Sequence, residues 1–85
     1  MYNLFTANSK TEKMLKIYID SRRDIKDKLD KLRKNPYKAN SAHRLHGKLS
    51  GKLACWLGSN IRVIYMIDEK TKRIIIEAVG THKIY

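Results

Sequence analysis

His43, Arg62 and His82 are the side chains of this sequence best suited to acid–base chemistry on a phosphate ester. Histidine accepts or donates a proton near neutral pH, and a guanidinium can bind two phosphoryl oxygens at once. Metal-free RNA cleavage needs a base for the 2′-hydroxyl, a cation beside the phosphorus and an acid for the departing 5′-oxygen. These residues therefore indicate a protein that binds RNA and has the groups needed to cut it.

Each of these residues also has a simpler interpretation. A single histidine is often a surface or turn residue, and on a strand His43 and His46 would point to opposite faces. Arg62 interrupts an apolar segment, so it either reaches solvent from an edge strand or sits on a central strand beside a phosphate site. Trp56 lies in an apolar run and either packs in the core or stacks on a base.

The charge distribution favours a polyanionic partner. No carboxylate occurs between Asp30 and Asp68, a stretch that holds eight Lys or Arg residues, two of the three histidines and the only tryptophan. The net charge is +11 and the pI about 10.0, which favours nucleic acid or an acidic protein, although a basic solvated surface remains the alternative. The residues predicted to contact RNA are Arg44, His46, Lys48, Lys52, Trp56 and Lys83.

Other chemistries lack the residues they need. The sequence has no Gly-rich phosphate loop and no Cys or His spacing typical of a metal site, so we expect neither a metal nor a cofactor. Asp68 and Glu69 have the setting of turn residues. Cys55 is the only cysteine, which predicts a small buried hydrophobe and a reducing compartment.

We expect a single domain over residues 1–85, because 85 residues leave no room for a second core. The first residues lack the apolar segment of a signal peptide, and no run approaches the ~20 apolar residues of a membrane span. The expected location is the cytoplasm.

Two helices are predicted in the first half of the chain. Ser9 and Glu12 have the spacing of a capping box, followed by an apolar stripe at helical spacing (Met14, Leu15, Tyr18 and Ile19). A second helix is expected over 21–34, with Ile25, Leu29 and Leu32 buried, acid-first i,i+4 pairs on its surface (Asp24–Lys28, Asp27–Lys31 and Asp30–Lys34), and a stop at Asn35–Pro36.

Short strands are predicted elsewhere, over 2–7, 45–50, 53–57, 61–67 and 73–79, separated by Gly and turn residues. The β-branched runs at 61–67 and 74–76 suggest strands covered on both faces. The predicted fold class is α+β, an antiparallel-rich sheet of four to five strands with an N-terminal strand and two helices on one face.

The order of these elements, with His43-x-Leu45-x-Gly47-x3-Gly51, Ile61-Arg62-Val63-Ile64-Tyr65 and Gly80-Thr81-His82-x-x-Tyr85, resembles the RelE/ParE toxin superfamily, in particular its RelE/StbE and YafQ-like branch. The resemblance implies a toxin of a type II toxin–antitoxin system that cleaves messenger RNA on the ribosome and is held inactive by a cognate acidic antitoxin. It implies no membrane and no small-molecule cofactor.

Within the resemblance, His43 matches the candidate general base and Arg62 the arginine that stabilises the phosphate. His82 matches the acid or charge stabiliser, and Tyr85 the C-terminal aromatic near the scissile nucleotide. The sequence departs from the pattern at three places. Trp56 stands where YafQ-like proteins carry another His, Asn60 where they carry Asp, and Lys52 where an aromatic is common. The His82–Tyr85 spacing is also one residue shorter than in many relatives.

The sequence is compatible with two rival functions. One is a non-enzymatic toxin of the same fold that poisons DNA gyrase, since fold alone does not fix function. The other is a non-catalytic basic RNA-binding module, whose affinity would fall steeply with salt.

Overall fold

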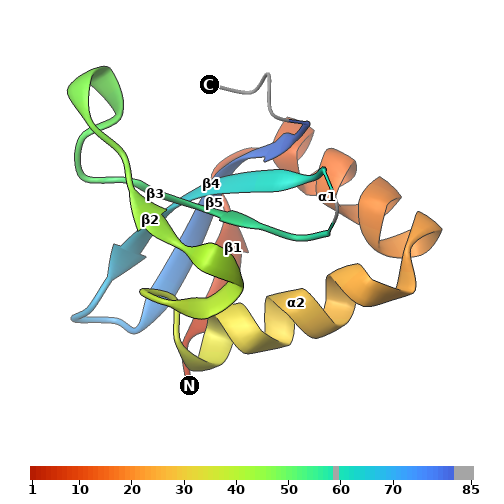
Figure 1. Ribbon diagram of the computed structural model, residues 1–85, viewed down its shortest axis with the longest axis horizontal. Helices are drawn as coiled ribbons and strands as arrows, with labels where there is room; N and C mark the ends of the chain where they lie inside the picture. Colours follow the sequence, from red (N-terminus) through yellow and green to blue (C-terminus); the bar gives the residue numbers. More distant parts are fainter. Residues whose placement is uncertain (59, 82–85) are drawn as a thin grey trace.

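The computed structural model describes residues 1–58 and 60–81, which form a five-stranded mixed sheet with two helices (Figure 1). The strand order is β1-β5-β4-β3-β2, with β1 parallel to β5 and the other neighbours antiparallel. The strands are β1 (Asn3–Thr6), β2 (His43–Arg44), β3 (Leu53–Trp56), β4 (Arg62–Asp68) and β5 (Arg73–Gly80). The predicted α+β fold class is confirmed.

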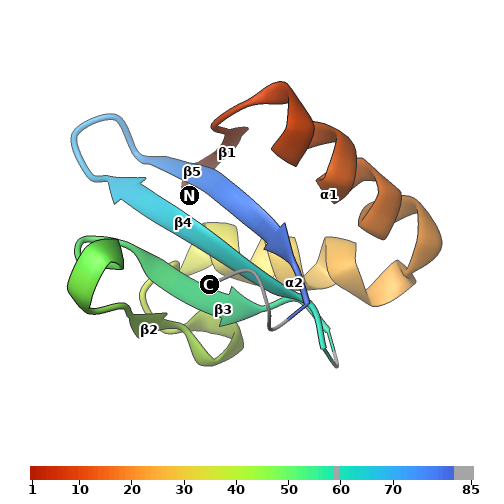
Figure 2. The same ribbon diagram turned by 90° about the horizontal axis from the view of Figure 1, so that it is seen from above.

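Helices α1 (Ser9–Ser21) and α2 (Arg23–Lys34) lie on one face of the sheet and leave the other face without a helix (Figure 2). The predicted stripe of α2 is buried, with Ile25 and Leu32 fully inaccessible and Leu29 6% exposed. These side chains pack against the helix-facing side chains of the sheet, which include Val63, Tyr65, Ile74 and Ile76. Neither helix is both long and apolar enough to cross a membrane in the part of the chain that the structure describes.

The start of α1 differs from the predicted capping box. Asn8 is the N-cap, and its side chain accepts a hydrogen bond from the Thr11 amide at 2.9 Å. Ser9 is already the first helical residue, so it cannot act as the cap. Asn8 is an equally good capping residue one position earlier, and the prediction of Ser9 as the cap is wrong.

The boundary between the helices also lies later than predicted, because Ser21 ends α1 and α2 begins at Arg23. On the surface of α2, Asp24 pairs with Arg22 at 3.4 Å and Asp30 with Arg33 at 3.9 Å instead of with the lysines predicted four residues further on. Such exposed pairs contribute little, so the choice of partner has a small effect on stability.

The predicted strand over 45–50 is wrong. The strand is the two-residue β2 just before it, and Gly47–Leu49 forms a 3-10 turn. Gly47 and Gly51 have φ angles of +69° and +91°, which an extended strand does not allow. The chain between β2 and β3 therefore forms a loop that stands away from the sheet (Figure 1).

The expectation that β4 is covered on both faces is also only partly met. Ile64 is 4% exposed on the face without helices, but Met66, two residues further along the same face, is 40% exposed. The β-branched run therefore reflects strand propensity as much as burial.

One end of the sheet is tied together by Glu69 in the β4–β5 turn. Its carboxylate accepts hydrogen bonds from Tyr2 Oη at 2.6 Å and Tyr37 Oη, and it pairs with Lys72 Nζ at 2.7 Å. The hydrogen bonds from Lys72, Tyr2 and Tyr37 lower the pKa of Glu69 to about 2. The expectation that Glu69 is a turn residue is confirmed. We call Glu69 and its three partners, Tyr2, Tyr37 and Lys72, the Glu69 cluster.

Candidate functional site

The face of the sheet without helices carries two of the predicted catalytic residues. Strand register pairs His43 with Ala54 across β2 and β3, and Trp56 with Arg62 across β3 and β4. Paired residues of antiparallel strands share a face, and so do residues two apart on one strand. His43, Trp56 and Arg62 therefore lie on the same surface, which we call the open face.

Arg62 belongs to the central strand of the sheet, so the alternative of an edge arginine is excluded. Its guanidinium carbon lies 4.1 Å from the centre of the Trp56 ring, and both side chains are partly exposed. On its other side Arg62 is paired with Gly80, which has no side chain to project over it. The stack holds the guanidinium against the indole ring on the open face.

Trp56 is therefore not a core residue. It is absent from the hydrophobic cluster that includes its neighbours Leu53, Cys55 and Leu57. One face of the indole is already occupied by Arg62 at 4.1 Å. Trp56 is thus suited to hold Arg62 in place, and only its opposite face is left for a base.

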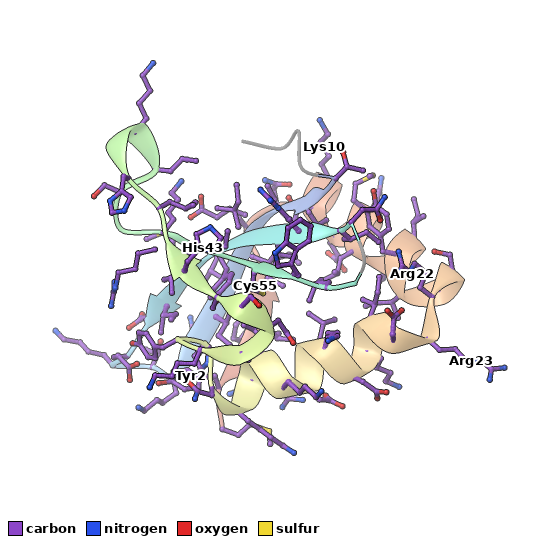
Figure 3. The ribbon with its side chains drawn as sticks, in the orientation of Figure 1. Tyr2, Lys10, Arg22, Arg23, His43 and Cys55 are labelled. Atoms are coloured by element: carbon purple, nitrogen blue, oxygen red, sulfur yellow. The ribbon has the colours of Figure 1, made fainter. Side chains whose placement is uncertain are left out.

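His43 is exposed at the start of β2 (Figure 3). Its Nδ1 lies 3.3 Å from the Ser41 carbonyl, which can only accept, so this contact is a hydrogen bond when Nδ1 carries the proton. That tautomer leaves Nε2 able to accept a proton. Register places the Cα atoms of His43 and Arg62 roughly 12 Å apart, two strand spacings across and two residues along.

The turn before β2 positions His43. Asn40 and Ser41 have φ angles of +56° and +58°, a backbone conformation that non-glycine residues seldom adopt. The Asn40 side chain donates to the Lys28 carbonyl at 2.8 Å, which ties this turn to α2. The Ser41 carbonyl is thereby set toward the imidazole.

The structure does not bring all the predicted RNA contacts together. Arg44 is paired with the core residue Leu53, and its guanidinium carbon lies 6.0 Å from the Tyr37 ring, near the Glu69 cluster. His46 and Lys48 are exposed on the loop that stands away from the sheet. Arg44 alternates to the opposite side of β2 from His43, so the two side chains do not share the open face.

Lys52 lies beside a carboxylate that the sequence did not associate with this surface. Its Nζ is 2.5 Å from Glu77 Oε1, and the two side chains are 28% and 23% exposed. Lys52 immediately precedes β3 and Glu77 belongs to β5, so the pair spans β4. The helix-facing side of β4 is filled by core residues, which places this pair on the open face.

Glu77 was missed because it lies outside the acid-free stretch of the sequence. It is the extra residue of a β-bulge, since Ile76 pairs with Tyr65 and Ala78 with Ile64. A bulge shifts the alternation of a strand and so redirects a side chain. No turn residue or other local signal marks it.

His82, Lys83 and Tyr85 lie outside the residues that the structure describes. Cys55 is buried, and burial raises the pKa of its thiol to about 12, which makes it an unreactive core residue as predicted. Within residues 1–58 and 60–81, no group of three or more His, Cys, Asp or Glu side chains is placed to hold a metal ion.

Comparison with known proteins gives likenesses in structure only. No protein-family model matches the chain, and no curated protein sequence does. A YoeB/ParE toxin from Agrobacterium tumefaciens superposes with a TM-score of 0.75 at 13% identity, covering 94% of this chain and 98% of that one.

Two further solved structures cover nearly the same extent. The YoeB–YefM toxin–antitoxin complex from Staphylococcus aureus matches with a TM-score of 0.75 at 15% identity over 96% of this chain and 98% of that chain. YafQ from Escherichia coli matches with a TM-score of 0.69 at 17% identity, over 96% of this chain and 94% of that chain. The chain therefore has the fold of the RelE/ParE toxins, as the sequence pattern indicated.

Proposed function

We propose that this protein is the toxin of a type II toxin–antitoxin system and an endoribonuclease that cleaves messenger RNA on the ribosome. The observation that carries the proposal is the placement of Arg62. It lies on the central strand, is stacked on Trp56, and shares the open face with His43. The similarity of the fold to YoeB and YafQ toxins supports a toxin role.

In the proposed reaction, Nε2 of His43 removes the proton from a 2′-hydroxyl, and the resulting oxyanion attacks the adjacent phosphorus. Arg62 stabilises the charge on the phosphoryl oxygens. The bond to the 5′-oxygen breaks as His82 donates a proton to it, which leaves a 2′,3′-cyclic phosphate and a free 5′-hydroxyl. Strand β5 ends at Gly80, opposite Arg62, and His82 is two residues further along the sequence. Tyr85 orients a base beside the scissile bond.

The proposed partners follow from charge and from the fold. A net charge of +11 suits both RNA and an acidic antitoxin. The matched Staphylococcus aureus structure is a toxin–antitoxin complex. We expect an acidic antitoxin to be expressed with this protein and to copurify with it at low salt.

The test is brief induction of the protein in bacteria, followed by mapping of transcript 5′ ends. We expect new 5′ ends within translated messages, and their loss with Arg62→Ala at unchanged protein level. Accumulated DNA breaks without cleaved transcripts would instead identify a gyrase poison. RNA binding with ribosomes but without cleavage would identify a non-catalytic RNA-binding module.

A further inference from the structure

The ion pair between Lys52 and Glu77 changes the electrostatics of the open face. The acid-free stretch of sequence would present Lys52 as an uncompensated cation, but the fold sets a carboxylate 2.5 Å from its ammonium group. Both side chains are about three-quarters buried. The lysine is therefore directed toward Glu77 and not outward to solvent.

The pair lies beside the proposed reaction site. Register extended by one residue from Leu53–Tyr65 places Lys52 next to Met66 on the open face. His43 is opposite Ala54, two residues further along that face of the sheet. The Cα atoms of Lys52 and His43 are therefore roughly 8 Å apart, one strand spacing across and two residues along. An RNA chain bound at His43 would bring a phosphate within reach of the Lys52 ammonium group, where it would compete with the Glu77 carboxylate.

We propose that Glu77 is a built-in competitor for RNA: its carboxylate occupies the phosphate-binding position of Lys52 and so lowers the affinity of the open face for RNA. This inference rests on the proposed function, because it takes the open face as the surface that binds RNA. A carboxylate and a phosphate make the same charge-assisted hydrogen bond to an ammonium group, so one replaces the other. Lys52 should therefore bind a phosphate more readily when the negative charge of Glu77 is removed.

The experiment measures binding of a short, fluorescein-labelled single-stranded RNA to the full chain between about 50 and 200 mM salt. Glu77→Gln keeps the size of the side chain, and the main-chain carbonyl of Glu77 still accepts from Thr11 Oγ1. We expect Glu77→Gln to bind roughly three- to tenfold more tightly at low salt. The slope of log K against log salt should steepen by about 0.7, the value for one further phosphate contact on a single strand.

Two further variants separate this effect from a general change in charge. Glu12→Gln removes a carboxylate that pairs with Lys16 at 3.6 Å on α1, far from the open face in the fold. It should leave the slope unchanged. In a Lys52→Gln background, Glu77→Gln should have no further effect on the slope, because the lysine that it releases is absent.

The outcomes are distinguishable. If wild type and all variants bind RNA with the same slope, or if Glu12→Gln acts like Glu77→Gln, the role of Glu77 is wrong while RNA binding stands. If neither wild type nor any variant binds RNA, the open face does not bind free RNA and this inference fails, whereas cleavage on the ribosome is tested separately by the mapping of transcript 5′ ends. A thermal melt of each variant verifies that it is folded before binding is compared.

Discussion

Arg62 and Trp56 are directly opposed across β3 and β4, with the guanidinium carbon 4.1 Å from the centre of the indole ring. A cation over an aromatic face at this distance contributes about 0.5–2 kcal/mol, depending on solvent access. The stack also restricts an otherwise mobile arginine side chain. Trp56 therefore acts on the proposed chemistry through the position of Arg62.

Replacing Trp56 should affect cleavage more than stability. We expect Trp56→Ala to lower the cleavage rate roughly ten- to thirtyfold, the equivalent of ~1–2 kcal/mol of lost stacking, because the guanidinium is no longer held. Trp56→Phe, which keeps an aromatic face, should retain most activity. The measurement is the rate of transcript cleavage after induction at matched protein levels. Equal losses for the two variants would show that stacking on Arg62 is not what Trp56 contributes.

The two neighbouring histidines should differ sharply. His43→Ala should lower the cleavage rate roughly 10²- to 10⁴-fold, the range for loss of a general base. His46→Ala is the matched control, since His46 is also exposed but lies on the loop away from the sheet. The free energy of unfolding of both variants should lie within about 0.5 kcal/mol of that of wild type. A larger loss of cleavage rate for His46→Ala than for His43→Ala would show that His43 is not the general base.

The Glu69 cluster predicts an acid-sensitive fold. Hydrogen bonds from Lys72, Tyr2 and Tyr37 lower the pKa of Glu69 from 4.5 to about 2. A carboxyl whose pKa is lower in the folded state stabilises the fold above pH 4.5, and this stabilisation is lost as the pH falls toward 2.

The measurement is the melting temperature of wild type and Glu69→Gln between pH 6 and pH 2, a range set around the usual carboxyl pKa of about 4.3. Wild type should be the more stable protein at pH 6, and the difference should shrink on acidification. Glu12→Gln leaves the Glu69 cluster intact and serves as the control. A difference that stays constant across this range would show that the hydrogen bonds to Glu69 do not stabilise the fold.

A side chain at Gly58 should destabilise the fold. Its φ angle is +152°, and a Cβ atom there would lie 2.8 Å from Nη2 of Arg22, at the junction of the two helices (Figure 3). We expect Gly58→Ala to lower the free energy of unfolding by about 1–3 kcal/mol, mainly from backbone strain at this φ angle, because the flexible Arg22 guanidinium can move aside.

Gly47→Ala is the control for Gly58→Ala. Its φ is +69° and nothing lies within 4 Å of the added Cβ, so it should cost only about 1 kcal/mol. Urea unfolding followed by circular dichroism measures both variants. Similar losses for the two would show that alanine adopts the φ angle of Gly58 as readily as that of Gly47.

Local sequence patterns were enough to predict most elements of this fold. The helical stripe of Ile25, Leu29 and Leu32 records burial directly, because a helix must hide its apolar side. The β-branched runs of the later strands record strand propensity as well as burial. The predictions failed where a backbone conformation decided the outcome. Gly47 and Gly51 turned an expected strand into a loop, and Asn8 took the capping position next to Ser9.

Sequence by itself also determined that the chain is strongly basic, and it identified His43 and Arg62 as candidate catalytic residues. Only the tertiary structure decided which residues share a surface. It separated Arg44 from His43 by the alternation of β2, and it used a β-bulge to bring Glu77 against Lys52. The reason is that strand order and register fix contacts between residues far apart in the chain, and no local pattern encodes either.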